Sequence, residues 1–317
     1  MAKEKKISLG IDLGGTKIAV GLCENGEILK KVIFPTQASA GFDGVIAVIA
    51  EAYSHVTAGF DTKRITGVGI GSAGQINGET GEVIYSPNLN WRNAPLGAAL
   101  RHKLGHEVKV LNDVRAATVA EHRYGNGKGC QSFANIFVGT GVGSGFVVNG
   151  QLVNGSTNSA GEIGHICMDP EGPVCGCGNK GCLEAFASGT GMENYTRSQL
   201  KSGRKSLLHE LAEGKLENVR GPLIGKAAEN GDELALEAIV RVGKYLGIAL
   251  ANVHTLINPE VILLGGGMMA LKKYFYEEML ASMKKHILPV ADRGDALIKS
   301  AKFENDAVLL GGAAIFS

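Results

Sequence analysis

The chain repeats one plan of three strands at two places, and this repeat restricts its possible folds more than any other feature. Residues 7–29 and 134–153 each read as an apolar strand, a glycine-rich turn, a second strand, an Asn-Gly turn and a third strand. Asn-Gly between apolar runs indicates a hairpin, because a type I′ turn needs a positive φ at both positions. The repeat predicts two related α/β halves facing a shared cleft, and the alternative is two unrelated hairpins in one sheet.

The spacing of apolar residues predicts the elements between and after these repeats. Helices are expected at 43–57, 114–124, 233–255 and 268–286, and buried strands at 64–70, 107–111 and 260–264. Residues 190–231 read as mostly polar helices, and 306–316 as a closing helix that Gly311-Gly312 interrupts. We expect a small N-terminal α/β domain at 1–119, closed by the C-terminal helix 306–317, and a large α/β domain at 120–305.

Charge and hydropathy restrict the partners and the compartment. The chain has 317 residues and a formal net charge of +1, which gives no electrostatic reason to expect nucleic acid or an anionic membrane as partner. The basic residues 1–6 are followed by ISLGIDLGGTK, in which Asp12 comes too early for the apolar core of a signal peptide. We therefore expect a cytoplasmic protein with no membrane-spanning segment.

Residues 164–182, GHICMDPEGPVCGCGNKGC, concentrate one histidine and four cysteines. A disulfide knot, a redox site, a catalytic metal and a structural metal are all compatible with this pattern. In a reducing cytoplasm, clustered cysteines more often bind metal or act in catalysis than form disulfides.

Three glycine-rich stretches at expected strand ends predict nucleotide binding. Glycine lets backbone amides approach phosphate oxygens, an aspartate can hold hydrated Mg²⁺, and a hydroxyl or an ammonium can bind phosphate. None of the stretches has the spacing of a P-loop, and any one alone could be a plain tight turn. The candidate residues are Asp12, Gly14, Gly15, Thr16 and Lys17, then Gly139, Thr140, Gly141 and Gly143, and finally Gly265 and Gly266.

Polar residues near these turns are suited to a sugar and to phosphoryl transfer. Asp113 follows Asn112 at the end of a strand, where an aspartate is also a favoured helix N-cap. A helix N-terminus would weaken the carboxylate as a base, but orientation matters more than basicity in a loose phosphoryl-transfer transition state. Glu162 and His165 could face one way on a helical turn, and Glu184 follows the cysteines directly.

Taken in order, these motifs resemble the ROK family of repressors, open reading frames and sugar kinases. The resemblance rests on Asp12-x-Gly-Gly-Thr, Asn112-Asp113, the second glycine turn, Glu162-Ile-Gly-His and the cysteine signature ending at Glu184. It implies an actin-like (ribonuclease H-like) two-domain fold and ATP-dependent phosphorylation of a hexose at its 6-hydroxyl. It also implies that Asp113 is the catalytic base, and that the sugar is contacted by Asn88, Asn112, Asp113, Glu162, His165 and Glu184.

The resemblance further implies a zinc site made of His165, Cys175, Cys177 and Cys182. Three thiolates and one imidazole complete a tetrahedral zinc with no open position, so the metal would be structural. The second imidazole nitrogen of His165 would then be free to donate to a sugar hydroxyl. Cys167 is the odd thiol of the segment, and we expect it to be a small buried residue in a strand.

Within the family, several features favour one branch. The Asp12 loop comes so early that no helix-turn-helix module is expected, which favours a kinase over a repressor. Residues 86–91, SPNLNW, followed by Pro95-Leu96, resemble the branch that phosphorylates glucose to glucose 6-phosphate. N-acetylmannosamine kinases, which usually differ in this stretch, are the alternative. Residues 72–74 and 112–115 depart from the usual pattern beside the sugar pocket, so the choice of hexose stays open. A non-catalytic sugar sensor is a further alternative. The expected partners are the sugar and ATP, in a homodimer or homotetramer.

Overall fold

The computed structural model describes residues 6–317, and the chain divides into two compact units. The first unit comprises residues up to Asn135, with Gly145–Gly161 and Ala301–Ser317; the second comprises Ile136–Ser144 and Glu162–Ser300. The first unit thus extends past residue 119 and includes the C-terminal helix. The basic start of the chain lies mostly outside the described residues.

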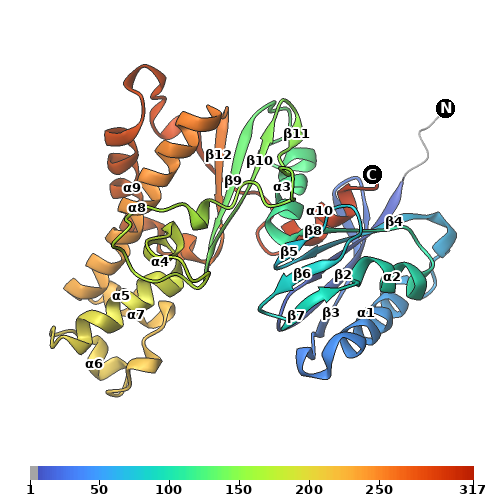
Figure 1. The fold of residues 1–317 in the computed structure, drawn as a ribbon, viewed down its shortest axis with the longest axis horizontal. Helices are drawn as coiled ribbons and strands as arrows, with labels where there is room; N and C mark the ends of the chain where they lie inside the picture. Colours follow the sequence, from blue (N-terminus) through green and yellow to red (C-terminus); the bar gives the residue numbers. More distant parts are fainter. Residues whose placement is uncertain (1–5) are drawn as a thin grey trace. The chain divides into compact units, whose positions relative to one another are not determined.

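The first unit is built on a five-stranded sheet in the order β3-β2-β1-β4-β8 (Figure 1). The strands are β1 (Ile7–Leu13), β2 (Lys17–Glu24), β3 (Glu27–Pro35), β4 (Ile65–Ser72) and β8 (Val108–Asn112). β1 pairs antiparallel with β2 and parallel with β4, and β4 pairs parallel with β8. The carboxyl ends of β1, β4 and β8 therefore lie side by side at one edge, which is where open α/β sheets bind ligands.

Helices cover both faces of this sheet. α1 (Gly41–Thr57) packs on one face with α2 (Leu96–Leu104) beside it, and α3 (Asp113–Tyr124) and α10 (Ala307–Ala314) pack together on the other. β2 alternates accordingly: Ile18 and Val20 belong to the core cluster with α1, whereas Ala19 belongs to the cluster with α10. Alternate residues of a strand point to opposite faces, so one strand contributes to both cores.

The expected interruption of the C-terminal helix at Gly311-Gly312 is wrong. α10 runs continuously through both glycines, which are buried. A Cβ at Gly312 would lie 2.5 Å from the backbone oxygen of Gly69 in β4, and one at Gly311 would lie 1.6 Å from that of Ala116 in α3. The glycines therefore permit close packing of α10, and this gain outweighs their poor helix propensity.

A small antiparallel sheet of β5 (Gln75–Ile76), β6 (Val83–Ser86) and β7 (Trp91–Ala94) belongs to the same unit. The connection between β6 and β7 carries Asn88, which is exposed, and Leu89, which is buried. The small sheet thus holds Asn88 at the surface of the first unit, while Ser86, Leu89 and Trp91 of the SPNLNW stretch are buried.

The second five-stranded sheet has the order β11-β10-β9-β12-β13, the same arrangement as the first sheet taken in sequence order. Its strands are β9 (Phe133–Val138), β10 (Val142–Val148), β11 (Gln151–Leu152), β12 (Val261–Gly265) and β13 (Ile298–Ser300). Both Asn-Gly turns have positive φ at each position: 50° and 86° at residues 25 and 26, and 52° and 72° at 149 and 150. The predicted repeat of one strand plan is confirmed.

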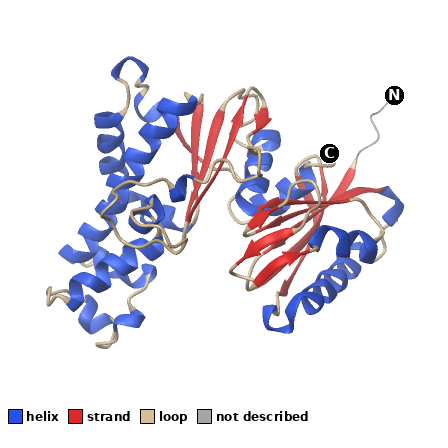
Figure 2. Ribbon diagram, in the orientation of Figure 1, coloured by secondary structure: helices blue, strands red, loops and turns tan. Residues whose placement is uncertain are grey.

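The second unit contains β12, β13 and the ends of β9 and β10 that border their connecting turn, and is otherwise mainly helical (Figure 2). The expectation of helices at 190–231 is confirmed, the helix expected at 233–255 extends to Ile257, and the one expected at 268–286 begins as a 3₁₀ turn. The α-helices are α4 (Leu183–Ala187), α5 (Gly189–Lys201), α6 (Leu208–Leu211), α7 (Gly221–Glu229), α8 (Glu233–Ile257) and α9 (Lys272–His286). The 3₁₀ turns in residues 6–317 are Ala38–Ala40, Thr62–Arg64, Ile163–His165, Leu216–Asn218, Gly267–Leu271, Pro289–Ala291 and Gly294–Leu297.

Over residues 6–317, none of the helices has the length and apolar character needed to cross a membrane.

Candidate functional site

Asp12 and Asp113 lie at the carboxyl edge of the first sheet. Asp12 is in β1 opposite Gly71 of β4, and Ser72 of β4 is opposite Asn112, the last residue of β8. The pKa of the Asp12 carboxyl is raised to about 6, first by burial and second by the charge of Asp113, while Lys17 lowers it. Two carboxylates that repel each other at a strand edge provide the ligands and the negative potential that a hydrated Mg²⁺ prefers.

Asn112, and not Asp113, caps helix α3. Its side-chain oxygen accepts hydrogen bonds from the backbone N–H groups of Val114 (3.0 Å) and Arg115 (3.3 Å). Its side-chain nitrogen donates to the backbone oxygen of Gly74 (3.2 Å). Asp113 uses one carboxylate oxygen for the Val114 N–H (2.8 Å). The capping role considered for Asp113 therefore falls mainly to its neighbour.

Burial raises the pKa of the Asp113 carboxyl, whereas hydrogen bonds from the backbone N–H groups of Val114 and Asp113 and from the Asn112 side chain lower it. The net direction is upward, so burial outweighs the weakening effect that the N–H groups of the helix terminus have on this carboxylate as a base. A carboxylate with a raised pKa is better suited to accept a proton near neutral pH.

The first glycine turn lies between β1 and β2, close to Asn88. The Gly14 N–H donates to the backbone oxygen of Lys17 (3.1 Å), which closes the turn, and the Thr36 hydroxyl donates to the Gly14 oxygen (2.7 Å). A Cβ at Gly15 would lie 3.0 Å from the backbone oxygen of Asn88. Thr16 and Lys17 are exposed. Within the first unit, the structure thus brings the predicted phosphate turn beside a predicted sugar contact.

The second glycine turn, in the second unit, lies between β9 and β10 and against Glu184. The Gly139 N–H donates to the Gly141 oxygen (2.9 Å), and the Val142 N–H donates to Oε2 of Glu184 (3.0 Å). A Cβ at Gly141 would lie 2.4 Å from the same Oε2. Gly143, also predicted to bind the nucleotide, is in strand β10 and outside the turn. Glu184 therefore supports the turn that is predicted to bind phosphate.

Two further loops meet this turn. Gly266 follows β12 with φ 93°, and a Cβ there would lie 2.5 Å from the backbone oxygen of Val138. The N–H groups of Gly189 and Thr190, at the start of α5, donate to the oxygens of Gly139 (2.7 Å) and Thr140 (3.3 Å). The α5 loop was missed from the sequence, although Ser188-Gly-Thr-Gly repeats the small and hydroxyl pattern of the turn and Ser188 caps the helix.

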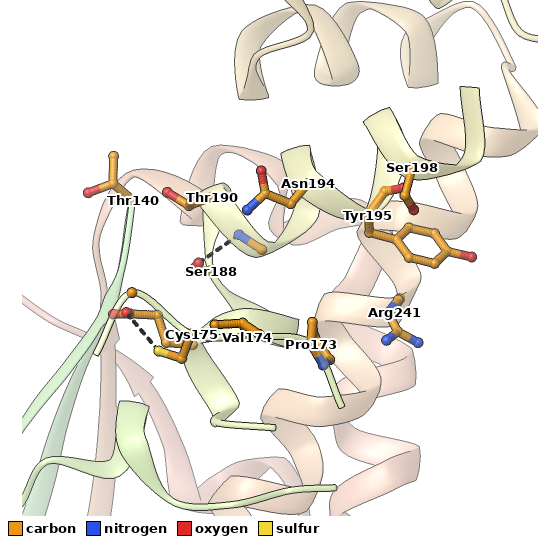
Figure 3. A pocket seen from close by; sticks show the side chains of 14 residues that line it. Thr140, Pro173, Val174, Cys175, Ser188, Thr190, Asn194, Tyr195, Ser198 and Arg241 are labelled. Carbon is orange, nitrogen blue, oxygen red and sulfur yellow. Dashed lines mark hydrogen bonds between the residues drawn. The ribbon is translucent and has the colours of Figure 1, made fainter. Parts of the chain in front are cut away.

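A pocket of about 320 Å³ adjoins the second turn (Figure 3). Thr140 lies at one end, Asn194 and Ser198 of α5 line one side, and Arg241 of α8 lies at the other end. Glu184 also lines the pocket. The Arg241 guanidinium stacks over the rings of Phe186, Tyr195 and Tyr245, at 4.7 to 5.1 Å from the ring centroids. The lining of hydroxyl, amide and aromatic groups is suited to a polar ligand.

Glu162 and His165 bracket a 3₁₀ turn, Ile163–His165, and both are exposed. The His165 N–H donates to the Glu162 oxygen (3.0 Å), and the Ile163 N–H donates to the hydroxyl of Ser144 (3.3 Å) in β10. Side chains three residues apart in a 3₁₀ turn lie nearly in line, so the expectation that this pair faces one way agrees with the backbone.

The side chains of His165, Cys175, Cys177 and Cys182 form one cluster, and their ligand atoms all lie within 4.8 Å of one another. Cys177 Sγ is 3.7 Å from Cys182 Sγ, and His165 Nδ1 is 3.8 Å from Cys175 Sγ. A tetrahedral zinc with bonds of about 2.3 Å separates its ligands by about 3.8 Å, so these donors fit zinc. Burial raises the pKa of the Cys175 thiol to about 12, so a nearby cation would be needed to hold it as a thiolate.

The expectation that Cys167 is buried is wrong, because its side chain is exposed. Cys167 forms an isolated β-bridge with Cys182. Strand-like geometry is therefore present, but it lies at the surface beside the cysteine cluster.

Arg115 was noted in the sequence only as a departure from the usual pattern. It is fully buried, and its guanidinium donates to the backbone oxygens of Asn158 and Ala160 and to the side-chain oxygen of Asn158. Asn158 in turn donates to the backbone oxygen of Ile76 (2.8 Å). Arg115 thus fixes the segment that leads into Glu162.

Comparisons with known proteins agree with the family resemblance of the sequence motifs. A sequence model described as "ROK family" matches residues 8–317. A glucokinase of Thermotoga maritima is 36% identical over 309 residues, which cover 97% of this chain and 96% of that protein. An N-acetylmannosamine kinase of Haemophilus influenzae is 30% identical over 306 residues, which cover 96% of this chain and 93% of that protein. The crystal structure of a ROK family glucokinase from Streptomyces griseus, in complex with glucose and AMPPNP, superposes with a TM-score of 0.77 at 31% identity and 98% coverage of both chains.

Proposed function

Because the chain belongs to the ROK family, we propose that it is an ATP-dependent hexose kinase that converts glucose to glucose 6-phosphate. Its fold is the actin-like fold of that family. The observation that carries the proposal is the Asp113 carboxyl, which lies at the carboxyl edge of the first sheet with a raised pKa and with its helix capped by Asn112. Such a carboxylate is suited to act as a general base.

In the proposed reaction, the Asp113 carboxylate orients the 6-hydroxyl of the sugar and accepts its proton. The sugar oxygen forms a bond to the γ-phosphorus of ATP, the bond between that phosphorus and the bridging oxygen breaks, and ADP leaves. Mg²⁺, held near Asp12, would neutralise charge on the phosphates. The N–H groups of the two glycine turns, with Thr16 and Lys17, would position the phosphate oxygens, and Gly266 would allow close approach of the nucleotide.

Glucose is favoured over other hexoses by the relatives and by the SPNLNW stretch. Asn88, Asn112, Glu162, His165 and Glu184 supply the amide, carboxylate and imidazole groups that hydrogen-bond sugar hydroxyls. A pocket built to bond a 2-hydroxyl discriminates strongly against an acetamido group at that position. N-acetylmannosamine remains the second candidate because a kinase for it is 30% identical to this chain.

The test is Asp113→Asn, which preserves shape and removes the anion. We expect turnover to fall by about 10² or more while Tm does not fall, because the amide removes the cost of burying an ionised carboxyl. The matched control is Asp43→Asn, since Asp43 is exposed on α1 of the same unit. A variant with near-normal turnover would argue for a different base, and a chain with no hexose-dependent ADP release at all would favour a sugar sensor.

We also propose that His165, Cys175, Cys177 and Cys182 hold a structural zinc. The support is the donor set and its separations, close to those of a tetrahedral site. When bound, zinc would fix the segment that carries His165 and Glu184. Since Nδ1 of His165 faces the cluster, Nε2 would be the nitrogen that donates to the sugar.

The homodimer or homotetramer expected from the family and the cytoplasmic location stay predictions. Light scattering after size-exclusion chromatography would give the mass of the assembly, and fluorescence microscopy of a tagged chain would give its location.

A further inference from the structure

Cys167 lies directly across a two-stranded ladder from Cys182. The ladder is held by hydrogen bonds from the Met168 N–H to the Gly181 oxygen (2.7 Å) and from the Leu183 N–H to the Ile166 oxygen (2.9 Å). Because these bonds flank the pair, Cys167 and Cys182 occupy a non-hydrogen-bonded position. Opposite residues at such positions have Cα atoms about 4.5 Å apart, which lies inside the range that a disulfide spans.

The two thiols of this pair differ in access and in neighbours. Cys167 is exposed, whereas Cys182 is 1% exposed and its Sγ is 3.7 Å from Cys177 Sγ. Cys167 Sγ rests 3.9 Å from the backbone oxygen of Lys180, so a disulfide needs a rotation about the Cα–Cβ bond of Cys167. An exposed thiol thus faces, across the ladder, a buried member of the metal-ligand cluster.

We propose that Cys167 is an oxidation site, which forms a disulfide with Cys182 when the chain meets a hydroperoxide and so removes one thiolate from the zinc cluster. The effect on zinc rests on the zinc site proposed above, whereas the disulfide itself does not. Cys167 has no role in the phosphoryl chemistry and is not one of the proposed zinc ligands. Because it is exposed, it can react with an oxidant and pass the oxidation to a cluster in which Cys175 and Cys182 are buried.

The chemistry balances with the peroxide as the two-electron oxidant. The Cys167 thiolate attacks one peroxide oxygen, the O–O bond breaks, and a sulfenic acid forms as water or an alcohol leaves. The Cys182 sulfur then attacks the Cys167 sulfur, the S–O bond breaks, and hydroxide leaves and is protonated to water. Two thiols and one hydroperoxide thus give one disulfide, one molecule of water from the second step, and one molecule of water or alcohol from the first. A zinc held by the cluster would be left with three protein ligands, and we expect it to be released as Zn²⁺.

Release of the metal would reach the sugar site through Glu184. This residue is two positions beyond Cys182, at the start of α4, and its Oε1 is 3.6 Å from Cys175 Sγ. Oxidation should therefore raise the apparent KM for sugar, and a dithiol with added zinc should restore it. The expected role is a reversible reduction of kinase activity under oxidative conditions.

The test uses full-length wild type, Cys167→Ser and the control Cys130→Ser, because Cys130 is partly exposed but lies outside the cluster. Zinc is first counted by elemental analysis. Its release into a chromogenic chelator is then followed after hydrogen peroxide is added. We expect about one zinc per chain to be released from the wild type and the Cys130 variant, and release at least about tenfold slower from the Cys167 variant. Without peroxide, kcat and KM of all three should agree.

The disulfide is identified by mass spectrometry after alkylation of the free thiols. Cleavage after Glu162, Glu171, Lys180 and Glu184 separates the relevant thiols onto three peptides, 163–171, 172–180 and 181–184. A bond between 163–171 and 181–184 supports the proposal. A bond between 172–180 and 181–184, with equal zinc release from the Cys167 variant, overturns it. A wild type that forms the Cys167–Cys182 bond but contains no zinc would refute the zinc site and leave the oxidation site standing.

Discussion

Replacing Asp12 with asparagine should make the ligand-free chain more stable and much less active. Asp12 is held at the sheet edge with its pKa raised from 3.8 to about 6, by burial first and then by the charge of Asp113. The folded chain therefore resists ionisation of a carboxyl that ionises readily when unfolded. An amide of the same shape removes this cost, and it also removes a ligand that the proposed Mg²⁺ would use.

The size of the effect follows from the shift. A rise of about two pKa units corresponds to about 3 kcal/mol at a pH where both states are ionised. Solvent reaches part of the Asp12 side chain, so the measured gain should lie between about 1 and 3 kcal/mol, or several degrees in Tm. Between about pH 4 and 6 the folded chain binds a proton that the unfolded chain has lost. The wild type therefore loses stability as pH rises through this window, and the variant does not.

The assay is thermal or urea unfolding of wild type, Asp12→Asn and the exposed control Asp43→Asn, from pH 4.5 to 8. The gain of the Asp12 variant should grow up to about pH 6 and then stay level, while its turnover falls by about 10² or more. Added Mg²⁺ with a non-hydrolysable ATP analogue should stabilise the wild type more than the variant. A variant that is no more stable than wild type at pH 7.5, or whose gain is equal at pH 4.5 and 7.5, would refute this reasoning.

Four further substitutions separate the parts of the site. Gly139→Ala should raise the KM for ATP alone, because a Cβ there meets nothing within 4 Å in the protein. Gly141→Ala should also raise the KM for sugar, because its Cβ would displace Glu184. Steady-state kinetics with each substrate varied would contradict this reasoning if the two variants had equal effects. Arg115→Met removes a buried guanidinium that donates to three acceptor atoms in a loop. The free energy of unfolding should therefore fall by about 3 kcal/mol, and the KM for sugar should rise. Unchanged values of both would contradict the anchoring role of Arg115. Cys177→Ala should release zinc, lower Tm and raise the KM for sugar, while ATP affinity stays nearly unchanged. Elemental analysis that finds no zinc in the wild type would disprove the metal site.

The repeat of strands could be predicted because its signals are local. An Asn-Gly pair adopts positive φ more readily than other residues do, so Asn25-Gly26 and Asn149-Gly150 could be placed as turns without knowledge of the rest of the chain. The position of Asp113 followed likewise from a strand that ends where a helix begins. The direction of its pKa was less accessible, because desolvation depends on side chains from distant parts of the chain.

Features that depend on packing could not be predicted from local signals. Gly311-Gly312 looks like a helix break until β4 and α3 are seen against α10. Cys167 looks like a core residue because its neighbours in sequence are apolar. The sequence does not show that its pairing with Cys182 lies at the surface. The contact of the α5 loop with the second glycine turn likewise joins segments about 50 residues apart, and pattern reading treats each segment separately.

The central claim, that this chain transfers the γ-phosphoryl group of ATP to the 6-hydroxyl of glucose, is tested most directly by an ADP-release assay with glucose, mannose, fructose and N-acetylmannosamine. The phosphorylated carbon of the product is identified by NMR. We predict the highest kcat/KM for glucose, glucose 6-phosphate as product, and loss of ADP release in Asp113→Asn. A higher kcat/KM for N-acetylmannosamine would identify the second candidate as the substrate, and the absence of hexose-dependent ADP release would contradict the claim that the chain is a sugar kinase.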